Sequence, residues 1–139
     1  MPRLRNARTT WVILALSMAV LLGLGVGGRA WQAREERVAV AKALTGGGEP
    51  NRAAWLLTRY GCGGCHTISG VPGADGQVAP PLNGLVQRVY IGGIARNTPE
   101  NLVAWIVNPQ QFSPHSAMPP TGIGPEDARD VAAYLYAQQ

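Results

Sequence analysis

Two cysteines and a histidine stand together in the run Cys62-Gly-Gly-Cys-His66, and their spacing could carry chemistry. On one helical turn, two thiols separated by two residues can reach the two vinyl groups of a porphyrin. The histidine that follows then lies below the macrocycle and can supply a nitrogen ligand to its iron. The motif therefore predicts one covalently attached haem c, bonded to Cys62 and Cys65 and ligated by His66.

Two other interpretations of this motif are weaker. A structural zinc site needs four ligands, and beyond the motif the C-terminal part of the chain adds only His115, without the usual spacing between ligand pairs. A thioredoxin-type dithiol expects strands alternating with helices, and no such pattern surrounds the motif. Because the chain holds two cysteines in all, none remains for a separate disulfide.

The second axial ligand of the iron can be sought by elimination among three methionines. Met1 and Met18 lie in the N-terminal part, whereas Met118 lies in the run Ala117-Met-Pro-Pro120, where prolines stiffen the backbone around the sulfur. A thioether opposite a histidine raises the reduction potential and suits electron transfer. Met118 is therefore the predicted ligand, with His115 as the alternative, since both cannot bind the same face of the iron.

Three helices and no strand are expected to position these residues. Pro50 suits the first turn of one helix and Gly61 its end, with an apolar i, i+3, i+4, i+7 stripe between them. A second helix begins after Thr98 as its cap and ends at Pro109. A third begins at Pro125.

Long loops join these helices. The stretches 67–97 and 108–124 are rich in glycine and proline and are expected to be ordered. Such long loops in a small domain need a surface to pack on, which a haem would supply. The expected fold class is all-α, with about three helices, haem-wrapping loops and one N-terminal transmembrane helix.

An apolar stretch at the N-terminus, residues 9–28, holds twenty uncharged residues between Arg8 and Arg29. A helix of that length rises about 30 Å, which matches the hydrocarbon core of a bilayer. A cleaved signal peptide is the alternative, but its apolar core usually runs about 7–15 residues and ends at a small-x-small site. The length favours an uncleaved, single-pass anchor.

The flanking charges predict the orientation of this anchor. Arg3, Arg5 and Arg8 precede the apolar stretch, so the positive-inside rule places the N-terminus in the cytoplasm. The haem-binding part is then exported, into the periplasm if the membrane is a bacterial inner membrane. The predicted parts are the N-terminus and anchor at 1–28, a helical stalk with a glycine hinge at 29–48, and a cytochrome c domain at 49–139.

The net charge of +4 is distributed unevenly along the chain. Residues 1–44 hold seven basic and two acidic side chains, a net charge of +5. Residues 45–139 hold five basic and six acidic side chains, a net charge of −1. A nucleic-acid-binding domain would need a basic surface on the folded part, so this class of partner is excluded.

Residues from about 50 to 138 resemble class I cytochromes c, and more narrowly the cytochrome c domains in, or fused to, subunit II of haem–copper oxidases. The residues that carry the resemblance are Gly61-Cys-Gly-Gly-Cys-His-Thr67, Pro80-Pro-Leu82, Arg88, Asn97-Thr-Pro-Glu-Asn-Leu102 with Trp105, Pro109, Met118-Pro119 and Tyr134.

The resemblance implies a small cytochrome c fold and further contacts around a haem. The carbonyl of Pro80 would accept a hydrogen bond from the ring of His66, Leu82 would pack on the haem, and the first and last helices would cross. Arg88 and Trp105 would approach a haem propionate. The alternatives are solvation for Arg88 and core packing for Trp105.

These observations predict an electron carrier rather than an enzyme, because two axial ligands leave the iron no open position. Its expected donor is a quinol–cytochrome c reductase or a dehydrogenase, and its expected acceptor is a terminal oxidase. Two alternatives stay open. The chain could be a fixed subunit of a larger oxidase or dehydrogenase complex, or a haem-based sensor in which Met118 is displaced.

Overall fold

The computed structural model describes the backbone of residues 3–138 and the side chains of residues 7–138. It divides into two compact units, one ending at Glu36 and the other beginning at Arg37. The side chains of Arg3 and Arg5, on which the orientation of the anchor partly depends, lie outside the described residues. The domain boundaries inferred from the sequence stay a prediction.

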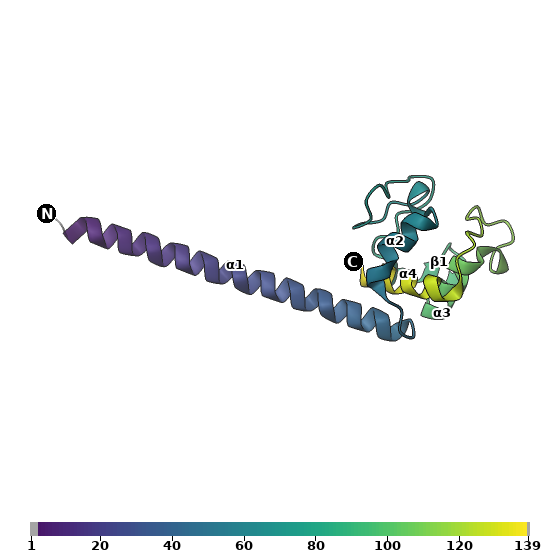
Figure 1. Ribbon diagram of the computed structural model, residues 1–139, viewed down its shortest axis with the longest axis horizontal. Helices are drawn as coiled ribbons and strands as arrows, with labels where there is room; N and C mark the ends of the chain where they lie inside the picture. The colour runs from purple at the N-terminus through teal and green to yellow at the C-terminus, as the bar shows by residue number, and fades with distance from the viewer. Residues whose placement is uncertain (1–2, 139) are drawn as a thin grey trace. The chain divides into compact units, whose positions relative to one another are not determined.

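A single helix, α1, runs from Arg3 to Leu44 (Figure 1). From Ala7 onward its most apolar window has a mean hydropathy of 2.1 and is not buried, so by length and composition it could cross a membrane. The large apolar side chains along this window are exposed, Trp11 to 73%. The same helix continues beyond this window to Leu44.

Three helices follow, as predicted: α2 (Pro50–Arg59), α3 (Pro99–Val107) and α4 (Pro125–Ala137). Each begins with a proline, whose missing N–H costs nothing in the first turn. The predicted cap of α3 is present, because Thr98 Oγ1 accepts a hydrogen bond of 3.2 Å from the backbone N–H of Asn101.

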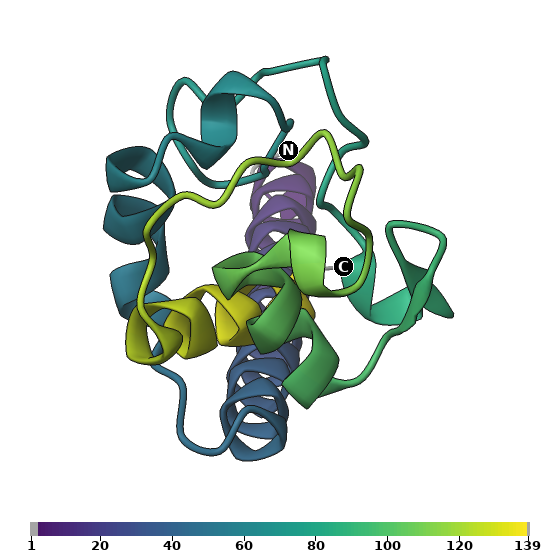
Figure 2. The same cartoon turned by 90° about the vertical axis from the view of Figure 1, so that its right-hand side faces the viewer.

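Helix α4 packs against both α2 and α3, and these contacts build the core (Figure 2). Leu56 and Leu57 of α2 are buried together with Val131 and Leu135 of α4. Apolar side chains of the long loops, such as Ile68 and Ile123, are buried in the same core cluster.

No convincing strand was predicted in the C-terminal part, and the structure contains one short hairpin there. Strands β1 (Tyr90–Ile91) and β2 (Ala95–Arg96) form a two-residue antiparallel hairpin. Gly92 and Gly93 have φ values of +56° and +73°, which glycine adopts without strain and which a tight hairpin turn requires. The remaining elements are three short 3₁₀ helices, η1 (Cys62–Gly64), η2 (Leu85–Gln87) and η3 (Pro109–Gln111).

The turn at Gly46–Gly48, expected to be a hinge, is held against α4. Glu49 N–H donates a 2.7 Å hydrogen bond to Oδ1 of Asp130, whose side chain is buried and also pairs with Arg52. A Cβ at Gly48 would lie 2.5 Å from the carbonyl oxygen of Arg129, so the backbones approach closely. These contacts restrict the freedom that three consecutive glycines would otherwise give.

Candidate functional site

The two cysteines lie on one short turn at the end of α2. Gly61, at φ +71°, reverses the chain, and η1 then carries Cys62. The backbone N–H groups of Cys65 and His66 both donate to the carbonyl of Cys62, at 3.3 and 3.0 Å. Both thiols are free and half-buried. The turn therefore presents two unpaired thiols three residues apart, with the histidine directly after them.

Burial raises the pKa of the Cys62 thiol, and the neighbouring Cys65 adds to the effect. A thiol with a raised pKa remains neutral near pH 7. Cys62 is therefore not a ready nucleophile or redox thiolate of the kind found in dithiol oxidoreductases. Among the described residues, no group of three or more His, Cys, Asp or Glu side chains could hold a metal ion.

One ring nitrogen of His66 is already engaged. Its Nδ1 lies 2.7 Å from the carbonyl oxygen of Pro80, which is the contact that the resemblance implied. Because a carbonyl can only accept, Nδ1 must carry the proton and donate. In the neutral imidazole the other nitrogen, Nε2, then carries no proton, so its lone pair can bind a metal.

Backbone hydrogen bonds hold the segment that carries Pro80 against the cysteine turn. Gly76 N–H donates to the carbonyl of Gly63 at 3.0 Å, and Ala79 N–H donates to that of Cys65 at 2.9 Å. A Cβ at Gly76 would lie 2.6 Å from backbone atoms of this turn, so the backbones of the two segments are in direct contact. The position of the His66 ring thus depends mainly on backbone contacts.

Leu82 and Arg88 continue this arrangement. Leu82 is partly buried against the core, and its N–H donates to the carbonyl of Thr67 at 3.0 Å. The guanidinium of Arg88 donates through Nη2 to the carbonyls of Pro81 and, at 3.3 Å, Asn83. Arg88 therefore holds the loop next to Pro80, and its contact with a propionate stays a prediction.

Trp105 lies in the core of the domain. Its side chain is 8% exposed, and its ring lies 5.8 Å from that of Phe112, centroid to centroid. It also lies against Gly92 in the hairpin, where a Cβ would collide with the indole. This packing agrees with the alternative reading of Trp105, and its approach to a propionate stays a prediction.

Met118 lies in a different loop and is partly buried against the core. Its backbone N–H donates to Oγ of Ser116 at 3.3 Å, and its carbonyl accepts a 2.8 Å hydrogen bond from Nε2 of Gln110. His115, the alternative ligand, has an exposed side chain in the same loop. This burial favours Met118 over His115 as the residue that faces the interior.

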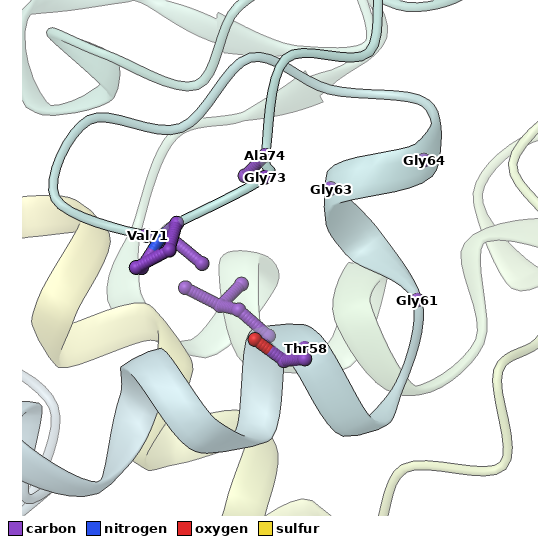
Figure 3. Close-up of a pocket in the computed structure, with 9 residues that line it drawn as sticks. Thr58, Gly61, Gly63, Gly64, Val71, Gly73 and Ala74 are labelled. Atoms are coloured by element: carbon purple, nitrogen blue, oxygen red, sulfur yellow. The ribbon is translucent and has the colours of Figure 1, made fainter.

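A small cleft of about 130 Å³ lies between the end of α2, the cysteine turn and the loop at residues 71–74 (Figure 3). Leu57, Val71 and Ala74 line it, with backbone atoms of Gly63 and Gly64. The cleft is therefore bounded on one side by the cysteine turn and on the other by apolar side chains.

Several contacts that hold the site were not predicted from the sequence. Asn97 Nδ2 donates to the carbonyls of Leu85 and Arg88, each at 2.8 Å, and Tyr136 O–H donates to Oδ1 of Asn97 at 2.8 Å. Gln110 was missed entirely. Isolated polar residues in loops give no periodic signal, so their partners become visible only in the folded chain.

Comparison with known proteins gives this geometry a family. The family model described as cytochrome c matches residues 52–138, which is well over half of the chain. A cytochrome c oxidase subunit 2 of the bacterium Alkalihalophilus pseudofirmus is 33% identical over 86 residues, 61% of this chain but 24% of that protein. The chain thus spans about a quarter of the length of that relative. No solved structure matches this chain. On the evidence of residues 52–138, the chain belongs to the cytochrome c family, whose members carry haem c and transfer electrons.

Proposed function

We propose that the chain is a membrane-anchored electron carrier with one haem c, covalently bonded to Cys62 and Cys65. In this proposal His66 Nε2 and the sulfur of Met118 are the axial ligands of the iron. The observation that supports it best is the hydrogen bond made by the His66 ring. Its Nδ1 donates to Pro80 at 2.7 Å directly beside two free thiols, so Nε2 is free to bind iron.

The donor set fits a haem c and fits other groups poorly. Two half-buried thiols three residues apart suit two thioether bonds, and an imidazole with one thioether suits a six-coordinate, low-spin iron. When bound, the haem supplies a reversible one-electron couple. The chain's own residues attach it, orient the His66 ring and cover part of its surface with apolar side chains such as Leu82.

The proposed location follows from α1. An apolar helix of this length suits a single-pass anchor in a bacterial inner membrane, with the N-terminus in the cytoplasm and the haem domain in the periplasm. Tethering raises the effective concentration of the carrier near partners in the same membrane. We propose a quinol–cytochrome c reductase or a dehydrogenase as donor and a terminal oxidase as acceptor.

The similarity to an oxidase subunit supports a second candidate function. The relative from Alkalihalophilus pseudofirmus is itself named as cytochrome c oxidase subunit 2. This chain could therefore act as a fixed cytochrome c subunit of a larger complex. Purification in a mild detergent separates the two cases: constant co-purification with other haem proteins supports the subunit, and a lone chain supports the mobile carrier.

An anaerobic redox titration of the purified full-length chain tests the proposed function. A carrier should titrate reversibly with one electron, and its reduced form should bind carbon monoxide slowly or not at all at neutral pH. Rapid carbon monoxide binding by the parent protein would contradict the carrier and favour a sensor with a displaceable ligand. A titration without any reversible haem couple would contradict both.

A further inference from the structure

Gln110 connects the end of α3 to the loop that carries Met118. It lies in η3, which forms because Phe112 and Ser113 both donate from their backbone N–H to the carbonyl of Pro109 at 3.1 Å. From this short helix the Gln110 amide reaches across the loop. Its Nε2 donates to the carbonyl of Met118 at 2.8 Å and to that of Ser116 at 3.4 Å.

Few backbone hydrogen bonds tie down the Met118 loop, although Met118 and the buried Ile123 pack against the core. Pro119 and Pro120 have no N–H to donate, and within the described chain the backbone N–H groups of residues 117–124 donate to no backbone carbonyl. The Met118 N–H reaches only the Ser116 hydroxyl, two residues away, at 3.3 Å. The hydrogen bond from the Gln110 amide therefore connects the backbone at Met118 to the short helix η3.

The other end of the same amide is left without a partner. Gln110 Oε1 is buried and makes no hydrogen bond, although Nε2 is fully used. The amide cannot simply be turned over, because its oxygen would then face two carbonyl oxygens. A buried acceptor without a donor is unfavourable, so Gln110 is a poor choice if stability alone is considered.

We infer that Gln110 is a positioning residue for the sulfur of Met118. It holds the backbone on which that sulfur is carried and so keeps the sulfur on the iron in both oxidation states. This inference rests on the proposed function, since it takes Met118 as the axial ligand. According to this inference, the Gln110 side chain sets the fraction of the protein in which the Met118 sulfur has left the iron.

Two variants of the full-length holoprotein test this role. Gln110→Leu removes the donor and also the unpaired oxygen while keeping a similar volume, and Gln110→Glu replaces the donor with an acceptor. Gln111→Leu is the matched control, because Gln111 is adjacent, chemically identical and exposed. The probes are the sulfur–iron absorption band of the oxidised protein, the reduction potential, and the rate of carbon monoxide binding to the reduced protein.

We expect both Gln110 variants to bind carbon monoxide at least about tenfold faster than the parent, because binding requires the state in which the sulfur has left. Their sulfur–iron band should weaken and their potential should fall. Because Gln110→Leu also leaves the carbonyls of Met118 and Ser116 without their donor, stability alone does not identify the role. The fall in potential and the faster carbon monoxide binding, which a purely structural role would not produce, identify it. The Gln111→Leu control should stay within about twofold of the parent, since it leaves the population of the open state unchanged.

The inference is overturned if both Gln110 variants bind carbon monoxide as slowly as Gln111→Leu and keep the full sulfur–iron band. A different result would reveal failure of the proposed function. If the parent protein itself lacks the sulfur–iron band, Met118 is not the ligand and the role of Gln110 falls with it. Comparison of parent and variants therefore separates the two failures.

Discussion

The segment that carries His66 and the segment that carries Met118 are held in place by different means. Around His66, backbone hydrogen bonds from Gly76 and Ala79 connect the cysteine turn to the chain that follows it. Around Met118, the support consists of hydrogen bonds from the Gln110 side chain and packing of Met118 against the core. In the proposed function these two segments would each supply one ligand to the iron, one held mainly by backbone contacts and the other mainly by side-chain contacts.

The difference indicates how each side responds to substitution. A backbone network tolerates most side-chain changes, but it fails where a glycine allows two backbones to touch. A loop held mainly by a side chain has the opposite sensitivity, because removal of that side chain removes the hydrogen bonds to its backbone. The His66 side should therefore break at glycines, and the Met118 side should break at polar side chains.

The largest effect is expected from Met118→Ala, with Met18→Ala in α1 as its control. Loss of the Met118 sulfur should leave the haem attached through Cys62 and Cys65. It should lower the reduction potential by on the order of 100 mV, within the roughly 0.8 V range that axial ligands span. The reduced variant should bind carbon monoxide readily. Spectroelectrochemistry checks both, and a Met118→Ala protein indistinguishable from Met18→Ala would remove Met118 from the site.

A pair of glycines within the cysteine motif tests the rigid side. A Cβ at Gly63 would lie 2.8 Å from Cα and Cβ of Ala74, whereas a Cβ at Gly64 would meet nothing within 4 Å (Figure 3). We expect Gly63→Ala to lower the free energy of unfolding by about 1–3 kcal/mol, as overpacking usually does. Gly64→Ala should change it by less than about 0.5 kcal/mol. Equal denaturation midpoints for Gly63→Ala and Gly64→Ala would contradict this prediction and show that the backbone of the turn can shift at little cost.

Tyr136 allows a test by pH of the contacts through which α4 holds the loop that follows Pro80. Burial, with the charge of Glu100 as a smaller cause, raises the pKa of Tyr136 from 10.0 to about 12. The folded state thus favours the protonated phenol, which donates to Asn97. Its contribution is complete below pH 10 and is lost as the pH rises through about 12. We expect this loss to be roughly 2 kcal/mol.

Denaturant unfolding followed by circular dichroism at several alkaline pH values measures this effect. Tyr136→Phe should remove the dependence on pH and cost about 1 kcal/mol at pH 7, because Asn97 loses a hydrogen bond. Tyr90→Phe is the control, since Tyr90 is half exposed in the hairpin. A Tyr136→Phe protein with the same alkaline profile as the parent would assign the dependence to other groups.

The smallest effect concerns salt. Asp75 is the one charged residue between 60 and 87, and residues 108–125 hold no Asp, Glu, Lys or Arg. Charge steering at these segments should therefore be weak. We expect the rate of oxidation by ferricyanide to change less than about threefold between low and physiological ionic strength. Ala117→Lys beside Met118 should increase this dependence more than Ala43→Lys in α1.

Much of the fold follows from local signals in the sequence. Prolines at the start of α2, α3 and α4 and the apolar stripes between loops predict these helices because both act over a few residues. The hairpin was missed because two residues per strand are too short to show an alternating pattern. The signal that was present is the pair Gly92-Gly93, which favours a tight turn.

The site was predictable where a motif specifies it and not elsewhere. Cys62, Cys65 and His66 are adjacent in the chain, so their arrangement on one turn follows from spacing. The contact between His66 and Pro80 came through family resemblance, because fourteen residues separate the two. Gln110, Asn97 and Tyr136 act through contacts that depend on how the loops fold over α4, and no local pattern encodes them.

The central claim is that Cys62 and Cys65 hold one haem by thioether bonds. Intact mass measurement of the full-length protein under denaturing conditions, after expression with a cytochrome c maturation system, tests it directly. The account predicts the mass of the chain plus one haem, and Cys62→Ser with Cys65→Ser should give the mass of the chain alone. Parent protein that releases all of its haem on denaturation, or that never acquires any, would contradict the account.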